Sequence, residues 1–155
     1  MSMGIPEIED AGCLLCFGYN GADSHPIVAR RIVRGRQKGM KIICADPRVT
    51  ETARISDIHL QLKGGSNLAL VNAMANVIWT EGLADTKFIE EHTKGFEEFL
   101  KVIKKYTPEY AEPITHIPAE TIRKAARMYA TTKPAMILYG MGVCQFTQAV
   151  DVVKG

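Results

Sequence analysis

The chain has 155 residues, 46% of them hydrophobic and 23% charged, which is the composition of one ordinary soluble domain with a buried core. Its net charge of +2 is too small to indicate a nucleic-acid surface or attraction to a membrane. No apolar stretch approaches the roughly 18 residues of a membrane-spanning helix, and the acidic segment 5–10 argues against a secretory leader. We therefore expect a cytoplasmic domain with reduced cysteines.

The first third of the chain predicts a strand, a helix and a second strand. The run Cys13–Phe17 is apolar throughout and is followed by glycine, as expected for a central strand that is buried on both faces. A helix is predicted from there to Gly39, with Ser24 as its cap and Pro26 in its first turn. Lys41–Ala45 then forms a short apolar strand, so a right-handed βαβ crossover is expected.

The middle of the chain contributes one more strand and three helices. Ile58–Leu62 alternates apolar with polar residues, as a third strand does. The apolar segment Leu68–Thr80, with a cap at Ser66 or Asn67, predicts a helix that is buried deeply against the sheet. Two shorter helical patterns without a polar cluster follow as scaffold, at Asp85–His92 and Phe96–Lys105.

The last third predicts the helix and strand that complete the sheet. The clearest amphipathic helix begins near Ile117 and is stopped by Lys133-Pro134. Ala135–Tyr139 follows as a fourth buried strand, and a glycine-rich turn leads to a last helix that could begin within 145–153. The whole pattern predicts an α/β fold: a Rossmann-like, open, mainly parallel sheet with helices on both faces.

Two cysteines three residues apart raise the question of a metal or redox site. Cys13 and Cys16 flank two leucines, and in a strand their side chains point to opposite faces of the sheet. Inert core thiols are therefore favoured over a zinc, iron–sulfur or disulfide role. Cys144, which follows the fourth predicted strand, is interpreted as structural too, so no metal ligand is expected in this chain.

Glycine-rich turns lie where strands are predicted to end, which is where open α/β sheets bind nucleotides. Glycine lets backbone N–H groups approach a ligand, and each following helix presents unpaired N–H groups that attract phosphate. The glycines concerned are Gly18, Gly64, Gly65, Gly140 and Gly142. The spacing lacks a Gly-x-Gly-x-x-Gly fingerprint, so any single glycine is also compatible with a simple turn.

Charged side chains accompany these turns. Asp46 follows the second predicted strand, roughly 20 residues after the first turn, where dinucleotide folds place their ribose-binding acid. Arg48 can pair with phosphate, and the carboxylate of Asp23 or Asp46 can accept two N–H groups from a guanine edge. Asp23 is equally compatible with a helix start and Asp46 with a turn, but their joint placement at strand ends favours a nucleotide site.

In combination these motifs resemble a known family. The segments that carry the resemblance are Phe17-Gly18-Tyr19-Asn20, Asp23-Ser24-His25-Pro26, Ala45-Asp46-Pro47-Arg48, Glu51-Thr52-Ala53-Arg54, Lys63-Gly64-Gly65-Ser66-Asn67, and Gly140-Met141-Gly142 with Gln145-Phe146. They look like the catalytic alpha subunit of molybdenum-dependent formate dehydrogenases, within the molybdopterin oxidoreductase family, over nearly the whole chain. Members of that family hold a molybdenum or tungsten ion between two molybdopterin guanine dinucleotides, which two Rossmann-like domains cradle, and these dehydrogenases oxidise formate to carbon dioxide.

The resemblance implies one part of an enzyme and not its catalytic centre. The family's enzymes run to several hundred residues. Three features of their active centre lie upstream of the matched segment: the cysteines of the 4Fe-4S cluster, the metal-ligating selenocysteine or cysteine, and the active-site histidine. Their catalytic arginine lies just beyond the position of Gly155. We therefore expect residues 1–155 to be a single molybdopterin guanine dinucleotide-binding domain that is inactive alone. It would work with the remaining domains of its subunit and with electron-transfer subunits.

The family's cofactor-contacting turns carry over to this chain residue by residue. The residues implied to bind the dinucleotide are Gly18, Tyr19, Asn20, Asp23, Ser24, Asp46, Pro47, Arg48, Lys63, Gly65, Asn67, Met141, Gly142 and Gln145. Two alternatives stay open: the equivalent domain of another molybdopterin oxidoreductase, such as a nitrate reductase or the large subunit of a respiratory complex, and a stand-alone nucleotide-binding module. The His25-Pro26 pair and the residues around Asp46 favour formate dehydrogenase among the enzymes.

Overall fold

A computed structural model describes residues 4–146 and residue 150. Four parallel strands form its sheet, in the order β3-β2-β1-β4. Their bounds are Cys13–Phe17 for β1, Lys41–Ala45 for β2, Ile58–Leu60 for β3 and Ala135–Tyr139 for β4. β1 is thus a central strand between β2 and β4, as its unbroken apolar sequence predicts.

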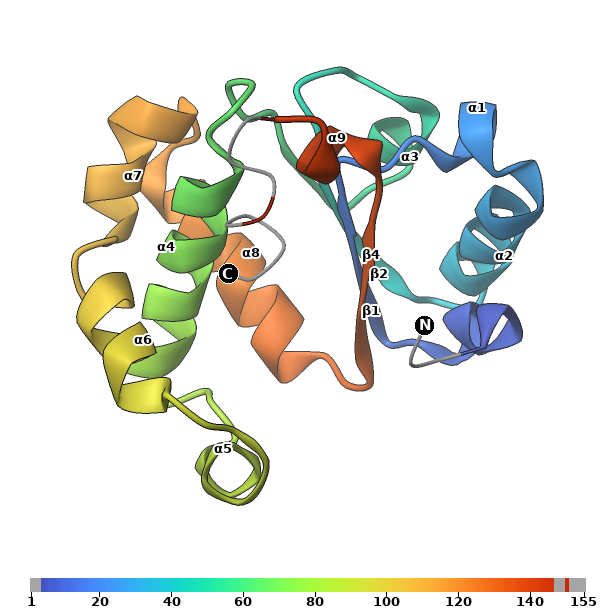
Figure 1. Cartoon of the computed structure of the whole chain (residues 1–155). Coiled ribbons are helices and arrows are strands. Elements are labelled where there is room, and N and C mark those ends of the chain that lie inside the picture. Colours follow the sequence, from blue (N-terminus) through green and yellow to red (C-terminus); the bar gives the residue numbers. More distant parts are fainter. Residues whose placement is uncertain (1–3, 147–149, 151–155) are drawn as a thin grey trace.

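Helices cover both faces of the sheet, which confirms the predicted fold class (Figure 1). The helices η1 (Ile5–Asp10), α1 (Gly21–Ser24) and α2 (Pro26–Gln37) lie on one side. The other side holds α4 (Asn67–Thr80), α6 (Phe96–Ile103), α7 (Pro108–Thr115) and α8 (Ala119–Thr131). The remaining helices are α3 (Glu51–Arg54), α5 (Thr86–His92) and α9 (Met141–Cys144). None of the helices in the described ranges is long and apolar enough to span a membrane.

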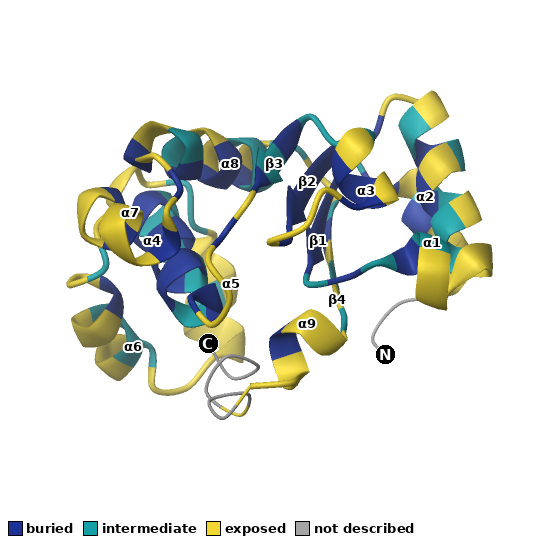
Figure 2. Cartoon of the chain, turned by 90° about the horizontal axis from the view of Figure 1, so that it is seen from above, coloured by how far each residue is buried: buried dark blue, intermediate teal, exposed yellow. Residues whose placement is uncertain are grey.

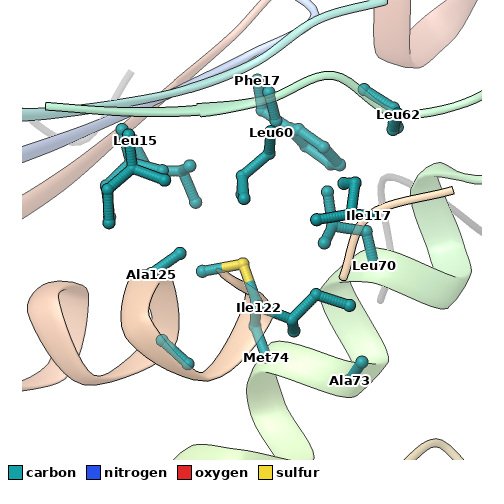
Figure 3. Packing of buried hydrophobic residues seen from close by; sticks show 14 of the residues in the cluster. Leu15, Phe17, Leu60, Leu62, Leu70, Ala73, Met74, Ile117, Ile122 and Ala125 are labelled. Atoms are coloured by element: carbon teal, nitrogen blue, oxygen red, sulfur yellow. The ribbon is translucent and has the colours of Figure 1, made fainter. Parts of the chain in front are cut away.

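The larger core cluster lies between the sheet and the helices α4 and α8 (Figure 3). Leu15 and Phe17 of β1 and Leu60 of β3 lie opposite Met74 of α4 and Ile122 of α8. Figure 2 shows the same concentration of buried residues in β1, β2 and parts of α4 and α8. Burying each large side chain contributes about 1.5–3 kcal/mol relative to leaving it in water, so this cluster holds α8 and the adjoining β4 in place.

The second core cluster lies on the opposite face of the sheet, under η1 and α2. Because side chains alternate along a strand, Cys13 belongs to the larger cluster and Cys16 to the second, as predicted. Burial raises the pKa of the Cys13 thiol to about 11 and raises the pKa of Cys16 as well. Both are therefore inert core thiols, whereas Cys144 in α9 is exposed.

The expected burial of β4 and the expected cap of α2 are both wrong. β4 is not a fully buried strand, because it is an edge strand in which Ile137 is 49% and Tyr139 56% exposed. Ser24 is not the cap of α2, because His25 occupies that position. The Ser24 hydroxyl instead donates to the carbonyl oxygen of Asn20 at 2.8 Å, which closes the short helix α1.

Several short elements leave no periodic pattern that the sequence could show. These are η1, α1, α3, α7 and α9. Of these, α3 and α7 begin at a capping threonine: Thr50 accepts a hydrogen bond from the Ala53 amide and Thr107 accepts one from the Tyr110 amide, each at 3.2 Å. β3 ends at Leu60 and not at Leu62, whose amide turns back to donate to the Leu60 carbonyl at 2.9 Å. Most of the predicted last helix lies outside the described residues.

Glu9 ties the beginning of the chain to α2. Its carboxylate, which is 11% exposed, pairs with the guanidinium of Arg31 at 2.5 Å and with the ammonium of Lys38 at 3.1 Å. Hydrogen bonds from these two side chains lower the pKa of Glu9 from 4.5 to about 2. The carboxylate is therefore stabilised in the folded state relative to the unfolded chain.

We predict that Glu9→Gln reduces the acid sensitivity of the domain. A carboxyl group whose pKa is lowered by folding stabilises the fold above its unfolded pKa, and this contribution is lost as the pH falls through the folded pKa. For Glu9 the loss runs from about pH 4.5 down to about pH 2. Urea unfolding across this range should show a steeper loss for the wild type than for Glu9→Gln. The exposed neighbour Glu7→Gln is the control, and equal slopes for wild type and Glu9→Gln would contradict the prediction.

Candidate functional site

A hollow of about 390 Å³ lies at the carboxyl ends of the parallel strands. The turns after β1, β2 and β4 line it, together with the loop that precedes α4. All the residues predicted for the site lie on its wall except Lys63 and Gly65. The hollow therefore brings together segments from the beginning, the middle and the end of the chain.

The wall also contains residues that were not among the predicted contacts: His25, Leu62, Gly64, Gly140 and Phe146. Gly64 and Gly140 belong to the glycine-rich turns, and His25 and Phe146 belong to motifs that carry the family resemblance. These four had a signal in the sequence. Leu62 had none, because an apolar residue in a ligand site has the same sequence pattern as one in the core.

Gly18 allows the turns after β1 and β4 to meet backbone to backbone. Its φ is +56°, and a Cβ placed on it would lie 2.7 Å from the carbonyl carbon of Gly142. The Gly142 amide donates to the Gly18 carbonyl at 3.1 Å, and the Gly140 amide donates to the Phe17 carbonyl at 3.1 Å. A Cβ on Gly140 would lie 2.7 Å from the Gly18 oxygen. Glycine at these positions is thus required to close one end of the hollow.

The segment around α1 forms another part of the wall. The side-chain amide of Asn20 donates to Asp23 Oδ2 at 2.6 Å. Asn20 Oδ1 and the Tyr19 hydroxyl are buried without a hydrogen-bond partner in the described part of the chain. Burial raises the pKa of Tyr19 to about 12, so the hydroxyl keeps its proton at neutral pH. The Tyr19 ring stacks on the ring of His25, with centroids 5.6 Å apart.

Asp46 is held in a defined orientation at the end of β2. The residue is only 5% exposed, and its Oδ1 accepts a hydrogen bond from the Arg48 amide at 2.8 Å. His59 Nε2 lies 2.9 Å from the Asp46 carbonyl oxygen, so β3 braces the same turn. Among the described residues, none donates to Asp46 Oδ2. The Arg48 side chain is 71% exposed, and its Nε lies 3.9 Å from Asp46 Oδ1. The site therefore pairs the fixed carboxylate of Asp46 with the long, exposed cationic side chain of Arg48.

The loop before α4 reaches the hollow through Asn67, whose side-chain amide donates to the Gly142 carbonyl at 3.4 Å. Lys63 and Gly65 belong to the same loop but do not line the hollow. The Lys63 amide donates to the Thr115 carbonyl at 2.9 Å, and the Lys63 carbonyl accepts from Ser66 Oγ at 2.6 Å. The backbone of Lys63 therefore anchors the loop to α7, and its role in binding stays a prediction.

A second, polar hollow of about 210 Å³ adjoins the first one and shares Asn20, Asp23 and Arg48 with it. Val49, Thr50 and Glu51, at the entry to α3, complete its lining. The described residues contain no group of three or more histidine, cysteine or acidic side chains that could hold a metal ion. The two hollows together suit an elongated, polar ligand with acceptor and donor groups along its length.

A family model described as molybdopterin oxidoreductase matches residues 1–155 of this chain. The chain belongs to the molybdopterin oxidoreductase family. It is 53% identical over 154 residues to formate dehydrogenase H of Escherichia coli strain K12 and 51% identical over 154 residues to the F420-dependent formate dehydrogenase subunit alpha of Methanocaldococcus jannaschii. Each alignment covers 99% of this chain but 22% and 23% of the respective relative.

More distant relatives also match over most of the chain. A nitrate reductase of Symbiobacterium thermophilum is 41% identical, over 92% of this chain and 20% of its own length. The solved structure of acetylene hydratase from Pelobacter acetylenicus matches with a TM-score of 0.88 and 30% identity, over 97% of this chain and 22% of that one. The chain thus spans about a fifth of the length of the curated relatives it matches. These matches confirm the resemblance to formate dehydrogenase alpha subunits, and family membership implies a molybdopterin-type cofactor with its metal.

Proposed function

We propose that residues 1–155 form the molybdopterin guanine dinucleotide-binding domain of the catalytic subunit of a formate dehydrogenase. The observation that carries this proposal is that the turns after β1, β2 and β4 meet in one hollow. The parent subunit would oxidise formate reversibly to carbon dioxide with molybdenum or tungsten. When bound, the metal and pterin supply the two-electron chemistry, while this domain binds and orients one dinucleotide and is inactive alone.

The polar groups of the hollow suit different parts of a guanine dinucleotide. The turns at Gly18 and Gly142 lack side chains and bring backbone atoms to the surface of the hollow, so that a diphosphate can lie close against them. Arg48 extends into solvent beside them and can pair with a phosphate. Asp46 Oδ2 can accept hydrogen bonds from ribose hydroxyls or from the N–H groups of guanine. Asn20 and Asn67 add an acceptor and a donor on either side.

The proposal assigns the other functions of the enzyme to parts of the subunit outside this segment. Because the chain spans about a fifth of the length of its relatives, the 4Fe-4S cluster, the metal ligand and the second dinucleotide would be held elsewhere in the parent. The domain's partners are then the remaining domains of its subunit and the electron-transfer subunits, in a cytoplasmic enzyme. A relative named as subunit alpha supports such a multi-subunit assembly.

Another enzyme of the family is the second candidate. Nitrate reductases match this domain at 41%, 35% and 36% identity, whereas formate dehydrogenase subunits match at 53% and 51% over 99% of the chain. This difference favours formate as the substrate of the parent. A stand-alone nucleotide-binding module is disfavoured, because the matched relatives are several times longer than this domain.

An NMR titration of the 155-residue chain with GDP, NAD⁺ and FMN tests the binding function. We expect GDP to shift the amide signals of the turns at Gly18, Asp46 and Gly142, because these turns line one hollow. The affinity should be weak, since the domain provides only part of the cofactor's contacts. Stronger binding of NAD⁺ or FMN at the same amides would contradict the proposal.

We predict that Asp46→Ala weakens GDP binding by about 1–3 kcal/mol, because a buried carboxylate acceptor is removed. Asp46→Asn should have a smaller effect, since it keeps an oxygen for the Arg48 amide but loses the charge. Asp10→Ala on the exposed end of η1 makes the same change in charge away from the hollow and should leave binding unchanged. Equal GDP affinities for the wild type and Asp46→Ala would mean that Asp46 only stabilises the turn after β2 and does not contact the nucleotide.

A further inference from the structure

The edge strand β4 carries apolar side chains that the described residues leave exposed. Ile137 is 49% and Tyr139 56% exposed. The strand register pairs Ile137 with Leu15 and Tyr139 with Phe17, so these side chains continue the face on which the larger core cluster lies. Leu15 and Phe17, one strand further in, are 6% and 5% exposed. The covering layer of helices therefore stops one strand short of the sheet edge.

β4 also lacks the features with which proteins protect an edge strand that faces water. Such strands usually carry charged residues or proline, or are bent by a bulge. The five residues of β4, Ala135–Tyr139, are all apolar apart from the tyrosine hydroxyl, and their register with β1 is unbroken. On the other face of β4 an apolar hollow of about 480 Å³ lies between the strand and η1, lined by Ile5 and Leu138 among others. Both sides of β4 thus have the character of a protein interior.

The handedness of the crossovers indicates what covers Ile137 and Tyr139. The step from β1 to β2 uses α2 on the face of the second core cluster. The chain then returns across the sheet from β3 to β4 through α4 and α8, on the face of the larger cluster. Right-handed crossovers require this change of face when the direction of travel reverses. A connection from β4 to a further strand beyond the sheet edge would cross the sheet in the same direction as the connection from β3 to β4. Its helix would therefore lie on the same face, over Ile137 and Tyr139.

We propose that, in the parent subunit, an amphipathic helix from the polypeptide that follows β4 packs its apolar side on Ile137 and Tyr139. It completes the layer that α4 and α8 begin. This inference rests on the proposed function only in taking the domain as part of a longer subunit, which the length of the relatives supports. A second copy of the chain is a poorer occupant, because two side chains fall far short of the roughly 800 Å² per partner in a standard interface. A helix of the same polypeptide is held nearby at a high effective concentration.

Cysteine labelling tests this inference directly. Ile137→Cys is introduced in a Cys144→Ser background, since Cys144 is exposed, both in the 155-residue chain and in the full-length parent subunit. The rate of maleimide modification at the introduced thiol is followed by peptide mass mapping. We expect modification to be at least about tenfold slower in the full-length subunit, where labelling requires local opening. Ile27→Cys, at a position on α2 that is 71% exposed, is the matched control and should be modified at equal rates in both proteins.

Two results would overturn the inference. Equal rates at position 137 in both proteins would mean that no polypeptide beyond residue 155 covers this face. Slower labelling of the 155-residue chain at higher protein concentration, together with dimer elution in gel filtration, would mean that a second copy covers it. Neither readout depends on nucleotides, so failure of the GDP titration with protection at position 137 would reject the cofactor proposal and leave this inference intact.

Discussion

Gly18→Val is expected to abolish nucleotide binding and also to destabilise the domain. The strand-end position of Gly18 alone predicts a blocked site with a largely intact fold. The structure shows two reasons why the variant should also be less stable. Gly18 has a φ of +56°, a conformation that costs an L-residue about 1–2 kcal/mol, and the Cβ of valine would lie 2.7 Å from the backbone of Gly142. Overpacking of this kind costs about 1–3 kcal/mol, so a total loss of about 2–5 kcal/mol is expected. Urea unfolding and the GDP titration measure the two effects separately.

Gly64→Val is the matched control for the stability effect. A Cβ on Gly64 has no atom within 4 Å, and no positive φ constrains the residue. Its unfolding free energy should change by less than about 0.5 kcal/mol. Because Gly64 lines the hollow, this variant serves only for stability. Gly18→Val could also unfold at the same urea concentration as the wild type and still bind GDP. That result would show that the close approach of the turns at Gly18 and Gly142 is needed neither for stability nor for binding.

Ile122→Ala should lower the free energy of unfolding by about 2–5 kcal/mol. Ile122 is fully buried and lies opposite Leu15 and Leu60 of the sheet and beside Met74 of α4 (Figure 3). Truncation would leave a cavity where α8 meets both the sheet and α4, and α8 leads directly into β4. Urea unfolding followed by circular dichroism measures the loss.

The effect of Ile122→Ala should be confined to stability. At temperatures well below the unfolding transition we expect GDP affinity to equal that of the wild type, because Ile122 lies outside the hollow. Ile27→Ala removes the same atoms from a side chain that is 71% exposed, and should change the unfolding free energy by less than about 0.5 kcal/mol. A loss of similar size in both variants would show that the difference in burial does not govern stability here.

The sequence predicted three of the strands with the bounds that the structure shows: Cys13–Phe17, Lys41–Ala45 and Ala135–Tyr139. Each is a short, mainly apolar run with a glycine or proline within two residues of either end, which leaves little freedom for a different boundary. The site residues around Gly18 and Asp46 followed from the same boundaries, because parallel strands end at one edge of the sheet. The part of the site that depends on strand ends was therefore predictable.

The rest depended on interactions between segments distant in the sequence. The edge position of β4 is set by the order of the strands, and a run of five apolar residues is the same for a central strand and for an edge strand that is covered from elsewhere. In the loop before α4, Gly64 and not Gly65 lines the hollow, because Gly65 turns the chain with a φ of +86°. Two adjacent glycines give no local signal for which one faces a ligand.

The pairing of β1 with β4 has a consequence for how the domain matures. Cys13, near the beginning of the chain, is the register partner of Ala135, near its end. During synthesis on the ribosome, β1, β2 and β3 can assemble early, but the two glycine turns meet only after β4 has emerged and docked. Joining such distant segments is a late and comparatively slow step. The hollow is therefore complete only once β4 has been translated and has docked, which sets the earliest stage at which the proposed ligand could bind.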